Sequence, residues 1–292
     1  MGGVAGDVER LPGAQSGMSA EAARATRERW RPTPLVAGSI GLHGLAAAGA
    51  LLIPGTWPLA LGAIAADHLF LTALGLWPRS SLLGPNLTRL PPAAERRGEI
   101  ALTLDDGPDA EVTPRVLDLL EAEDCKATFF CIAERVRAHA ELCREIVRRG
   151  HRVENHSFTH GASFPFLPLG ALRREVASAQ AMIAEVTGEA PRFFRAPAGL
   201  RNPLLDPVLH EAGLSLVTWT RRGFDTRERD AAVVACRLLR GLRAGDILLL
   251  HDGHAARTRE GQPVVLGALT AVLEAARVRH LRPTTLERAI AR

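Results

Sequence analysis

The stretch EIALTLDDGP, residues 99–108, runs from apolar residues directly into two neighbouring carboxylates. Its first part, EIALTL (99–104), is the kind of short apolar run that forms a strand buried on both faces of a parallel sheet. The DDGP that follows has the composition of a turn, where Asp105 and Asp106 could simply cap the next helix. The stretch therefore predicts a buried strand with two acidic side chains at its carboxyl end.

Downstream of this stretch, short apolar runs alternate with helix-like segments. The predicted strands are 99–104, 126–132, 152–155, 192–196, 214–220, 246–251 and 281–286, and the predicted helices are 111–123, 134–149, 169–187, 203–212, 230–242 and 263–278. Such alternation is typical of α/β proteins with a mostly parallel sheet and right-handed crossovers.

The number of these units limits the choice of α/β fold. Seven units or so in about 195 residues are short for an eight-unit barrel, which takes about 250 residues. We therefore expect a distorted or incomplete (β/α) barrel of about seven units. An open doubly wound sheet is the alternative, but no glycine-rich nucleotide loop follows the first strand.

The composition is ordinary for a globular protein and excludes some partners. Of 292 residues, 47% are hydrophobic and 23% are charged. The formal net charge of +4, from 36 Lys and Arg against 32 Asp and Glu, comes without a basic block, so nucleic acid is not an expected partner. Four cysteines without a C-x-x-C pair do not form a disulfide framework, and we expect buried thiols.

Two apolar runs precede the α/β pattern. Residues 35–53 and 58–77 each have about the 20 residues that a transmembrane helix needs, and Pro54 and Gly55 form a turn between them. We therefore expect a disordered N-terminal tail (1–33), a transmembrane helical hairpin (34–77), a juxtamembrane linker (78–97) and one soluble domain (98–292). A cleaved signal peptide and a buried helix pair are the alternatives.

Charged residues around the hairpin predict its orientation. Arginines lie on both flanks, at 24, 27, 29 and 31 and at 79, 89, 96 and 97, whereas the turn has no charge. The positive-inside rule then puts the soluble domain on the cytoplasmic side of a bacterial inner membrane, and the external side is the alternative. Asp67 and His68 lie in mid-span, where an aspartate costs about 2.5–3.5 kcal/mol. We expect Asp67 to pair with His43, and helix contacts without a role are the alternative.

Polar side chains gather after the predicted strands, at the end where (β/α) barrels hold their active sites. They are Asp105 and Asp106, His156 and His160, Arg195, Trp219 and Asp225, and His251 and Asp252. Each of these residues, taken alone, could have a purely structural role as a helix cap, a loop residue or a structural pair. Charge at one edge of an apolar sheet is costly unless it is paired or bound to metal, so together they favour a functional site.

Four motifs in this set resemble those of a known family. TLDDGP (103–108), HSFTH (156–160), RAPAG (195–199) and LLLHDG (248–253) stand in the order and spacing of the NodB-homology polysaccharide deacetylases, carbohydrate esterase family four. The resemblance covers about residues 96–290 and leaves the hairpin outside it.

The resemblance implies a role for each matching residue. It implies that Asp106, His156 and His160 bind one divalent metal ion, that Asp105 is the catalytic base, and that Arg195 orients it. Two imidazoles and a carboxylate leave positions open on the metal, as catalytic zinc sites require. Zinc is the expected metal, and cobalt, nickel or manganese are the alternatives.

The resemblance also assigns residues to the departing amine and the substrate. It implies that His251 is the general acid and that Asp225 raises the pKa of that histidine. Pro197, Ala198 and Trp219 are expected at the substrate and its oxyanion.

The chain departs from the family pattern in three places. Leu104 replaces a phenylalanine, Ala198 replaces an aromatic residue, and Trp219 precedes Asp225 where the usual motif is D-x-x-D-W. His254, just past LLLHDG, is the alternative proton donor.

The expected function is metal-dependent hydrolysis of the N-acetyl or other N-acyl group of an amino sugar. The sugar would belong to a polysaccharide, an oligosaccharide or, for a site on the cytoplasmic face, a lipid-linked glycan. The alternative is a membrane-tethered glycan-binding or scaffold protein with a catalytically silent site. A metallopeptidase is disfavoured because Ser157 stands where H-E-x-x-H has its glutamate. A metal phosphodiesterase is disfavoured because the sequence has no second metal cluster.

Overall fold

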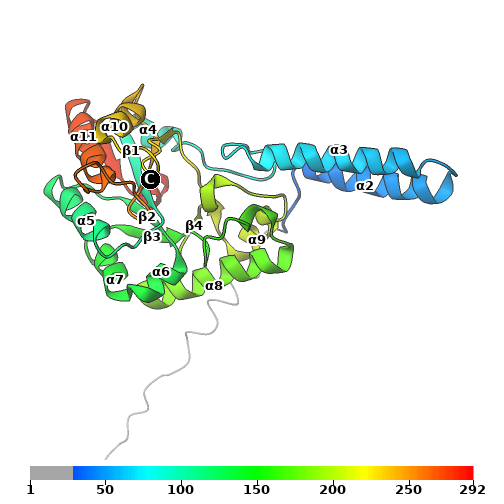
Figure 1. Cartoon of the computed structure of the whole chain (residues 1–292), viewed down its shortest axis with the longest axis horizontal. Helices are drawn as coiled ribbons and strands as arrows, with labels where there is room; N and C mark the ends of the chain where they lie inside the picture. The colour runs from blue at the N-terminus through cyan, green and yellow to red at the C-terminus, as the bar shows by residue number, and fades with distance from the viewer. Residues whose placement is uncertain (1–28, 292) are drawn as a thin grey trace, which may run out of the picture. The chain divides into compact units, whose positions relative to one another are not determined.

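The computed structural model describes residues 29–291, and Figure 1 shows their helices and strands. Most of the predicted N-terminal tail, residues 1–28 of 1–33, lies outside the described residues. The strands are β1 (Glu99–Asp105), β2 (Thr128–Cys131), β3 (Arg152–Asn155), β4 (Phe193–Phe194), β5 (Ser215–Leu216), β6 (Arg221–Arg222), β7 (Ile247–His251) and β8 (Arg282–Thr284).

The helices of this α/β part follow the strands along the chain. They are α4 (Pro92–Arg96), α5 (Val112–Ala122), α6 (Ala133–Ala138), α7 (Ala140–Arg148), α8 (Leu169–Thr187), α9 (Leu205–Ala212), α10 (Ala231–Leu239), α11 (Val264–Val278) and α12 (Leu286–Ile290). Two short 3-10 turns, η1 (Phe164–Phe166) and η2 (Pro197–Gly199), complete the set.

The strands form one parallel sheet with β1 near its centre. The order is β5-β4-β3-β2-β1-β7-β6, and β8 pairs with the first residues of β1. The register places Asp105 opposite Phe130 of β2 and His251 of β7. The two neighbouring strands therefore deliver Asp105 and His251 to the same level of the sheet.

The chain connection between the outermost strands requires the sheet to curl. β5 and β6 lie at opposite edges, yet only residues 217–220 separate them. A flat sheet of seven strands would be roughly 29 Å across at about 4.8 Å per strand, whereas the five steps from Leu216 to Arg221 reach at most about 18 Å. The structure thus confirms a distorted barrel and contradicts the open doubly wound alternative.

Alternation along the strands separates an outer from an inner face. Ile100, Leu102 and Leu104 of β1 pack outward into the main core, with residues of α5, α7, α10 and α11. Their neighbours Ala101 and Asp105 point the other way, toward an inner cluster that includes Phe130, Trp219 and Leu249. The period of two in a strand therefore places the acidic end of β1 inside the barrel.

Two predicted elements differ from the observed ones because the chain bends within them. The predicted helix 134–149 is broken at His139, whose φ of −128° and ψ of 48° are not helical, and so divides into α6 and α7. The predicted strand 214–220 pairs with β4 only at Ser215 and Leu216. Its remainder crosses to the far edge, where the Thr220 N–H donates to the Ile247 carbonyl over 2.9 Å.

The C-terminal strand and the cysteines also differ from expectation. The predicted strand 281–286 ends at Thr284, and Thr285 caps α12 by accepting from the Arg288 N–H. Three cysteines are buried, but Cys236 is exposed, because α10 turns Val234, Ala235 and Leu238 inward instead.

The segment expected to be a linker, 78–97, packs along the α/β part. Leu83, Leu90 and Ala94 are buried, and the bridge between Leu87 and Val217 extends the sheet edge. Arg89 pairs with Asp246 over 2.7 Å. The boundaries of the expected domains stay predictions.

Two apolar helices precede this segment, α2 (Pro34–Leu52) and α3 (Trp57–Gly75). They pack against each other, and each is long and apolar enough to cross a membrane by length and composition. Thr33 begins α2 by accepting from the Val36 N–H. The helices begin and end within two residues of the predicted runs.

Polar residues of α2 and α3 face each other in mid-helix. His43 Nδ1 lies 3.9 Å from Asp67 Oδ2, close to the pairing that the sequence predicts. Asp67 also accepts from Ser39 Oγ over 2.6 Å, and His43 Nε2 lies 3.1 Å from His68 Nε2. Ser39 is thus a further partner of the mid-helix aspartate.

A buried histidine links α7 to β2. His151 is 1% exposed, its Nδ1 accepts from the Ala127 N–H over 3.1 Å, and its ring stands edge-on to Phe129. Among the described residues its Nε2 has no hydrogen-bond partner. Burial lowers the pKa of His151 to about 4, so the native state holds the ring neutral.

We predict that His151 makes the fold sensitive to mild acid. In the unfolded chain a histidine takes up a proton near pH 6.5, so below that pH the unfolded state binds more protons and stability falls with falling pH. From pH 7.5 to pH 5 His151 should contribute about 2 kcal/mol to this loss. Urea unfolding of the full chain in detergent, at both pH values, measures it.

The control is His151→Asn, whose amide oxygen can accept from Ala127 without titrating. This variant should lose about 2 kcal/mol less between the two pH values than the parent chain does. His280→Asn, at an exposed position, should behave like the parent. An equal acid loss in the parent and in His151→Asn would contradict the assignment.

Candidate functional site

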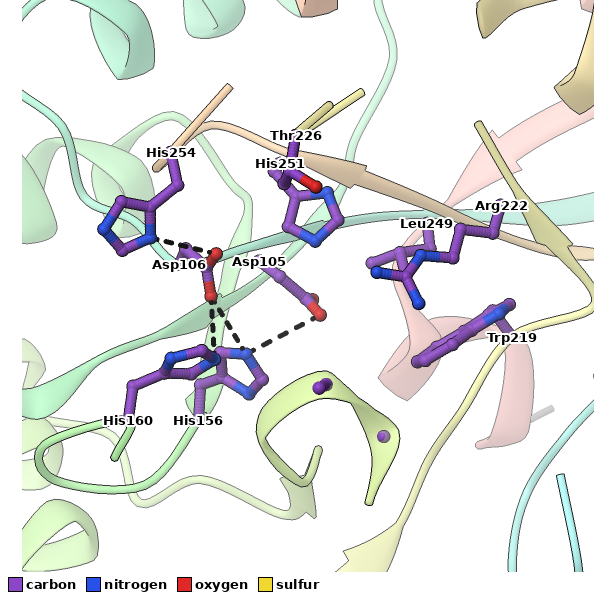
Figure 2. Close-up of a pocket in the computed structure, with 12 residues that line it drawn as sticks. Asp105, Asp106, His156, His160, Trp219, Arg222, Thr226, Leu249, His251 and His254 are labelled. Atoms are coloured by element: carbon purple, nitrogen blue, oxygen red, sulfur yellow. Dashed lines mark hydrogen bonds and ion pairs between the residues drawn. The ribbon is translucent and has the colours of Figure 1, made fainter. Parts of the chain in front are cut away.

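A pocket of about 200 Å³ lies inside the curled sheet, at the carboxyl ends of its strands (Figure 2). It is lined by Asp105, Asp106, His156, His160, Ala198, Gly199, Trp219, Arg222, Thr226, Leu249, His251 and His254. The structure thus gathers most of the residues that the sequence singles out. Arg195 and Asp225 lie behind this wall, and Pro197 is buried and does not line the pocket.

Three of these residues form a compact donor set. The ligand atoms of Asp106, His156 and His160 all lie within 4.8 Å of one another. The Nε2 atoms of both histidines are 3.2 Å from Asp106 Oδ1. The other ring nitrogen of His156, Nδ1, lies 2.7 Å from the Arg195 carbonyl, so a proton there donates to that oxygen and Nε2 faces the carboxylate.

The local backbone is unusual at these residues. Asp106, Ser157 and His160 have φ values of 70°, 64° and 56°, in the left-handed region that non-glycine residues rarely occupy. HSFTH forms a loop after β3 and not a helix. Within it, Ser157 Oγ accepts from the His160 N–H over 3.1 Å, which holds both histidines on one side. Strained backbone of this kind persists at functional sites.

The charges of this donor set fit a divalent cation. Burial opposes ionisation of Asp106, but contacts with His156 and His254 outweigh it and hold the pKa of Asp106 well below its usual range. Burial also opposes a charged His156, yet the carboxylates of Asp105 and Asp106 raise its pKa. The pKa of His160 is lowered to about 4 by burial, so this imidazole is neutral.

Asp106 therefore supplies a fixed negative charge to the donor set, which suits a bound cation. Asp106 Oδ1, the atom shared by both histidines, is buried and has no hydrogen-bond donor among residues 29–291. Two imidazoles and one carboxylate are ligands that zinc and similar metals accept. These residues fit the metal that the sequence implies.

Asp105 is fixed by a fully buried arginine. Arg195 Nη1 donates to Asp105 Oδ1 over 2.6 Å and to Thr103 Oγ1 over 2.8 Å. Its Nη2 donates to the Thr218 carbonyl, and its guanidinium stacks 4.1 Å from the ring centre of Phe130. The second oxygen of Asp105, Oδ2, faces the donor set, 3.7 Å from His156 Nε2.

His251 is held by Asp225 despite the altered fourth motif. Its Nδ1 lies 2.8 Å from Asp225 Oδ1, and its backbone N–H donates to Asp225 Oδ2 over 2.7 Å. Burial opposes a charged imidazole, but the Asp225 carboxylate outweighs it and raises the pKa of His251. The structure therefore brings together His251 and Asp225, although the fourth motif departs from the family pattern.

The remaining expected residues lie around this centre. Ala198, with φ of 54°, and Trp219 line the pocket. His254, the alternative proton donor, lies beside the donor set instead, with Nδ1 3.2 Å from Asp106 Oδ2 and Nε2 2.7 Å from Arg135. Sequence reasoning missed Arg222, which stands three residues after Trp219.

Comparisons with known proteins agree with these motifs. A family model described as polysaccharide deacetylase matches residues 93–217. A peptidoglycan-N-acetylglucosamine deacetylase of Listeria monocytogenes is 34% identical over 175 residues, which are 58% of this chain and 36% of that protein. The chain thus spans about a third of the length of this relative. A chitooligosaccharide deacetylase of Azorhizobium caulinodans is 32% identical over 198 residues, 63% of this chain and 91% of that protein.

Solved structures show the same fold. A family 4 carbohydrate esterase from Streptomyces lividans, in complex with acetate, superimposes with a TM-score of 0.57 at 27% identity and covers 64% of this chain and 91% of that one. Because a relative at 32% identity is matched over 91% of its length, the chain belongs to the polysaccharide deacetylase (NodB-homology, carbohydrate esterase four) family.

Proposed function

We propose that this chain is a metal-dependent hydrolase that removes the N-acetyl or another N-acyl group from an amino sugar of a glycan. The observation that carries the proposal is the combination of three features at one pocket. Asp105 is held by Arg195, His251 is held by Asp225, and the donor set of Asp106, His156 and His160 lies beside them. The relatives named above act on N-acetylglucosamine or chitooligosaccharides, which supports the sugar class.

Asp106, His156 and His160 would hold the metal. A divalent cation there, zinc or else cobalt, nickel or manganese, would polarise the amide carbonyl and lower the pKa of a water molecule. The proton of His156 Nδ1 is directed to the Arg195 carbonyl, which keeps Nε2 available as a ligand.

Asp105 is suited to act as the base. Arg195 holds its Oδ1, and its Oδ2 faces the donor set and can accept a proton from the water that attacks the amide carbon. His251 is suited to act as the acid. Asp225 favours its imidazolium form, whose Nε2 proton can pass to the departing amine nitrogen. We assign a backbone N–H near Ala198 to bind the carbonyl oxygen of the substrate's amide, and Trp219 to contact the sugar ring.

The alternative function, a membrane-tethered glycan-binding or scaffold protein with a silent site, requires no such set of proton-transfer groups. The pairing of Asp105 with Arg195 and of His251 with Asp225 therefore favours the hydrolase.

We further propose that α2 and α3 tether the enzyme to a bacterial inner membrane, with the pocket on the cytoplasmic side or, as the alternative, on the external side. Two contacts join the end of α3 to the pocket. The Arg201 N–H donates to the Gly75 carbonyl over 3.1 Å, and a Cβ on Gly199 would come within 2.8 Å of Pro78. A pocket beside the end of a membrane helix suits a lipid-linked sugar.

We predict that Asp105→Asn lowers kcat for deacetylation by about 10²–10⁴-fold, because the amide cannot accept the proton of the water. The assay is acetate release by the full chain from N-acetylglucosamine oligomers, peptidoglycan fragments and lipid-linked N-acetylglucosamine. Glu141→Gln, at an exposed acid distant from the pocket, should retain parental activity. Undiminished acetate release by Asp105→Asn would contradict the proposed mechanism.

We predict one tightly bound divalent metal ion per chain, which His156→Ala or Asp106→Asn releases because each removes a ligand. Elemental analysis and zinc titration of the purified full chain measure the stoichiometry. The exposed His280→Ala should bind metal like the parent. A parent chain that takes up none of zinc, cobalt, nickel or manganese would exclude this metal centre.

We predict that a reporter fused after Arg292 lies on the cytoplasmic side, because arginines flank both helices of the hairpin. β-Galactosidase fused there should be active and alkaline phosphatase inactive. The same two reporters fused within the turn at Gly55 should give the opposite pattern. An active phosphatase after Arg292 would move the substrate search to the cell wall.

A further inference from the structure

The pocket contains a cation that the proposed hydrolysis does not use. Arg222 of β6 pairs in register with Leu249, so its side chain belongs to the inner face of the sheet. Its guanidinium contacts two aromatic rings, 5.2 Å from the ring centre of Trp219 and 4.9 Å from that of Phe224. Figure 2 shows it beside Trp219, on the opposite side of Asp105 from His156 and His160.

Arg222 lacks the acidic partner that neighbouring arginines have. Arg221 binds Asp246 over 3.0 Å, and Arg237 lies 3.1 Å from Glu228. Across residues 29–291 no carboxylate lies within 4.0 Å of the Arg222 guanidinium, and its buried Nε has no hydrogen-bond acceptor. A half-buried charge left in this state is costly, so a ligand is its expected partner.

The acids of the pocket do not account for Arg222 either. Asp105 already binds Arg195, Asp225 already binds His251, and Asp106 faces the histidines of the donor set. These carboxylates lie near enough to favour the charge on Arg222, but none of them is in contact with its guanidinium. An arginine fixed by ring stacking keeps its N–H groups in a planar fork that matches carboxylate and phosphate.

We propose that Arg222 binds an anionic group of the substrate, so that the amino sugar carries a phosphate or a carboxylate beside the ring that is deacylated. The inference rests on the proposed function and narrows its substrate class. The shared chemistry is an oxyanion in a fork of N–H donors. Its source is either the phosphate that links a sugar to a lipid or an acid group on the sugar itself.

The experiment compares three probes on the full chain in detergent, with metal bound and with Asp105→Asn to prevent turnover. The probes are N-acetylglucosamine 1-phosphate, N-acetylmuramic acid and the neutral methyl glycoside of N-acetylglucosamine, titrated by calorimetry. We expect one anionic sugar to bind about 10–100-fold more tightly than the neutral one. Preference for the phosphate or for the carboxylate identifies the source of the oxyanion.

Variants then assign the preference to Arg222. Arg222→Gln should reduce the ratio of anionic to neutral affinity to within about twofold, and Arg222→Lys should restore part of it, because lysine keeps the charge but not the fork. Arg227→Gln removes an exposed arginine of the same loop and should retain the ratio. Equal affinity of the Asp105→Asn chain for all three probes, its failure to bind either anionic sugar, or a preference that survives the addition of Arg222→Gln would overturn the proposal.

Acetate release by the parent chain separates this proposal from the proposed function. Efficient deacetylation of neutral sugars, with no gain for anionic ones, would reject the role of Arg222 and leave the hydrolase standing. If an anionic sugar binds through Arg222 but no assay shows its deacetylation, the role of Arg222 in binding is supported and the proposed hydrolase is rejected.

Discussion

The ion pair between Arg195 and Asp105 is the contact on which the rest of the structure depends. Arg195 is fully buried, and three different parts of the chain satisfy its donors and its carbonyl. It binds Asp105 and Thr103 of β1, the carbonyls of Val217 and Thr218, and, through its own carbonyl, the ring of His156. Loss of one partner of such a pair costs about 3–5 kcal/mol, because the other charge is left buried and alone.

The same residue thus couples the closure of the barrel to the placement of the site. Residues 217–220 leave the edge of β4 and cross to β7, and the Arg195 guanidinium holds the start of that crossing. Asp105, His156 and the bend that closes the sheet are therefore all held by one residue, through its guanidinium and its carbonyl. This explains why a charged group can be tolerated at the centre of an apolar barrel.

Sequence patterns predicted the parts of the structure that depend on local periodicity. The strand at 152–155 and the helix at 169–187 have the bounds that their apolar runs and flanking residues predict. The donor set was also predictable, because residues that follow parallel strands share one edge of the sheet. The roles assigned to Asp105 and to the three residues of the donor set stay proposals.

What the sequence did not predict depends on contacts between distant segments. Nothing marks the break at His139, since neither glycine nor proline stands there. The apolar run 214–220 has strand composition, but its residues divide between two sheet edges, which only the closed barrel defines. Nothing in the sequence distinguishes Arg222 from a surface arginine, because its position on the inner face follows from its pairing with Leu249.

The altered fourth motif shows how such a departure can be a rearrangement and not a loss. Five residues separate Trp219 from Asp225, and two of them, Arg221 and Arg222, form β6 beside β7. Asp225 still contacts His251, because strand β6 accommodates the residues between Trp219 and Asp225. Side chains alternate between the two faces of a strand, so Arg222 lies on the face opposite to Arg221, which is the inner one. The spacing between Trp219 and Asp225 makes the pairing of Asp225 with His251 hard to predict from the sequence. The same spacing places Arg222, which has no carboxylate partner, in the pocket.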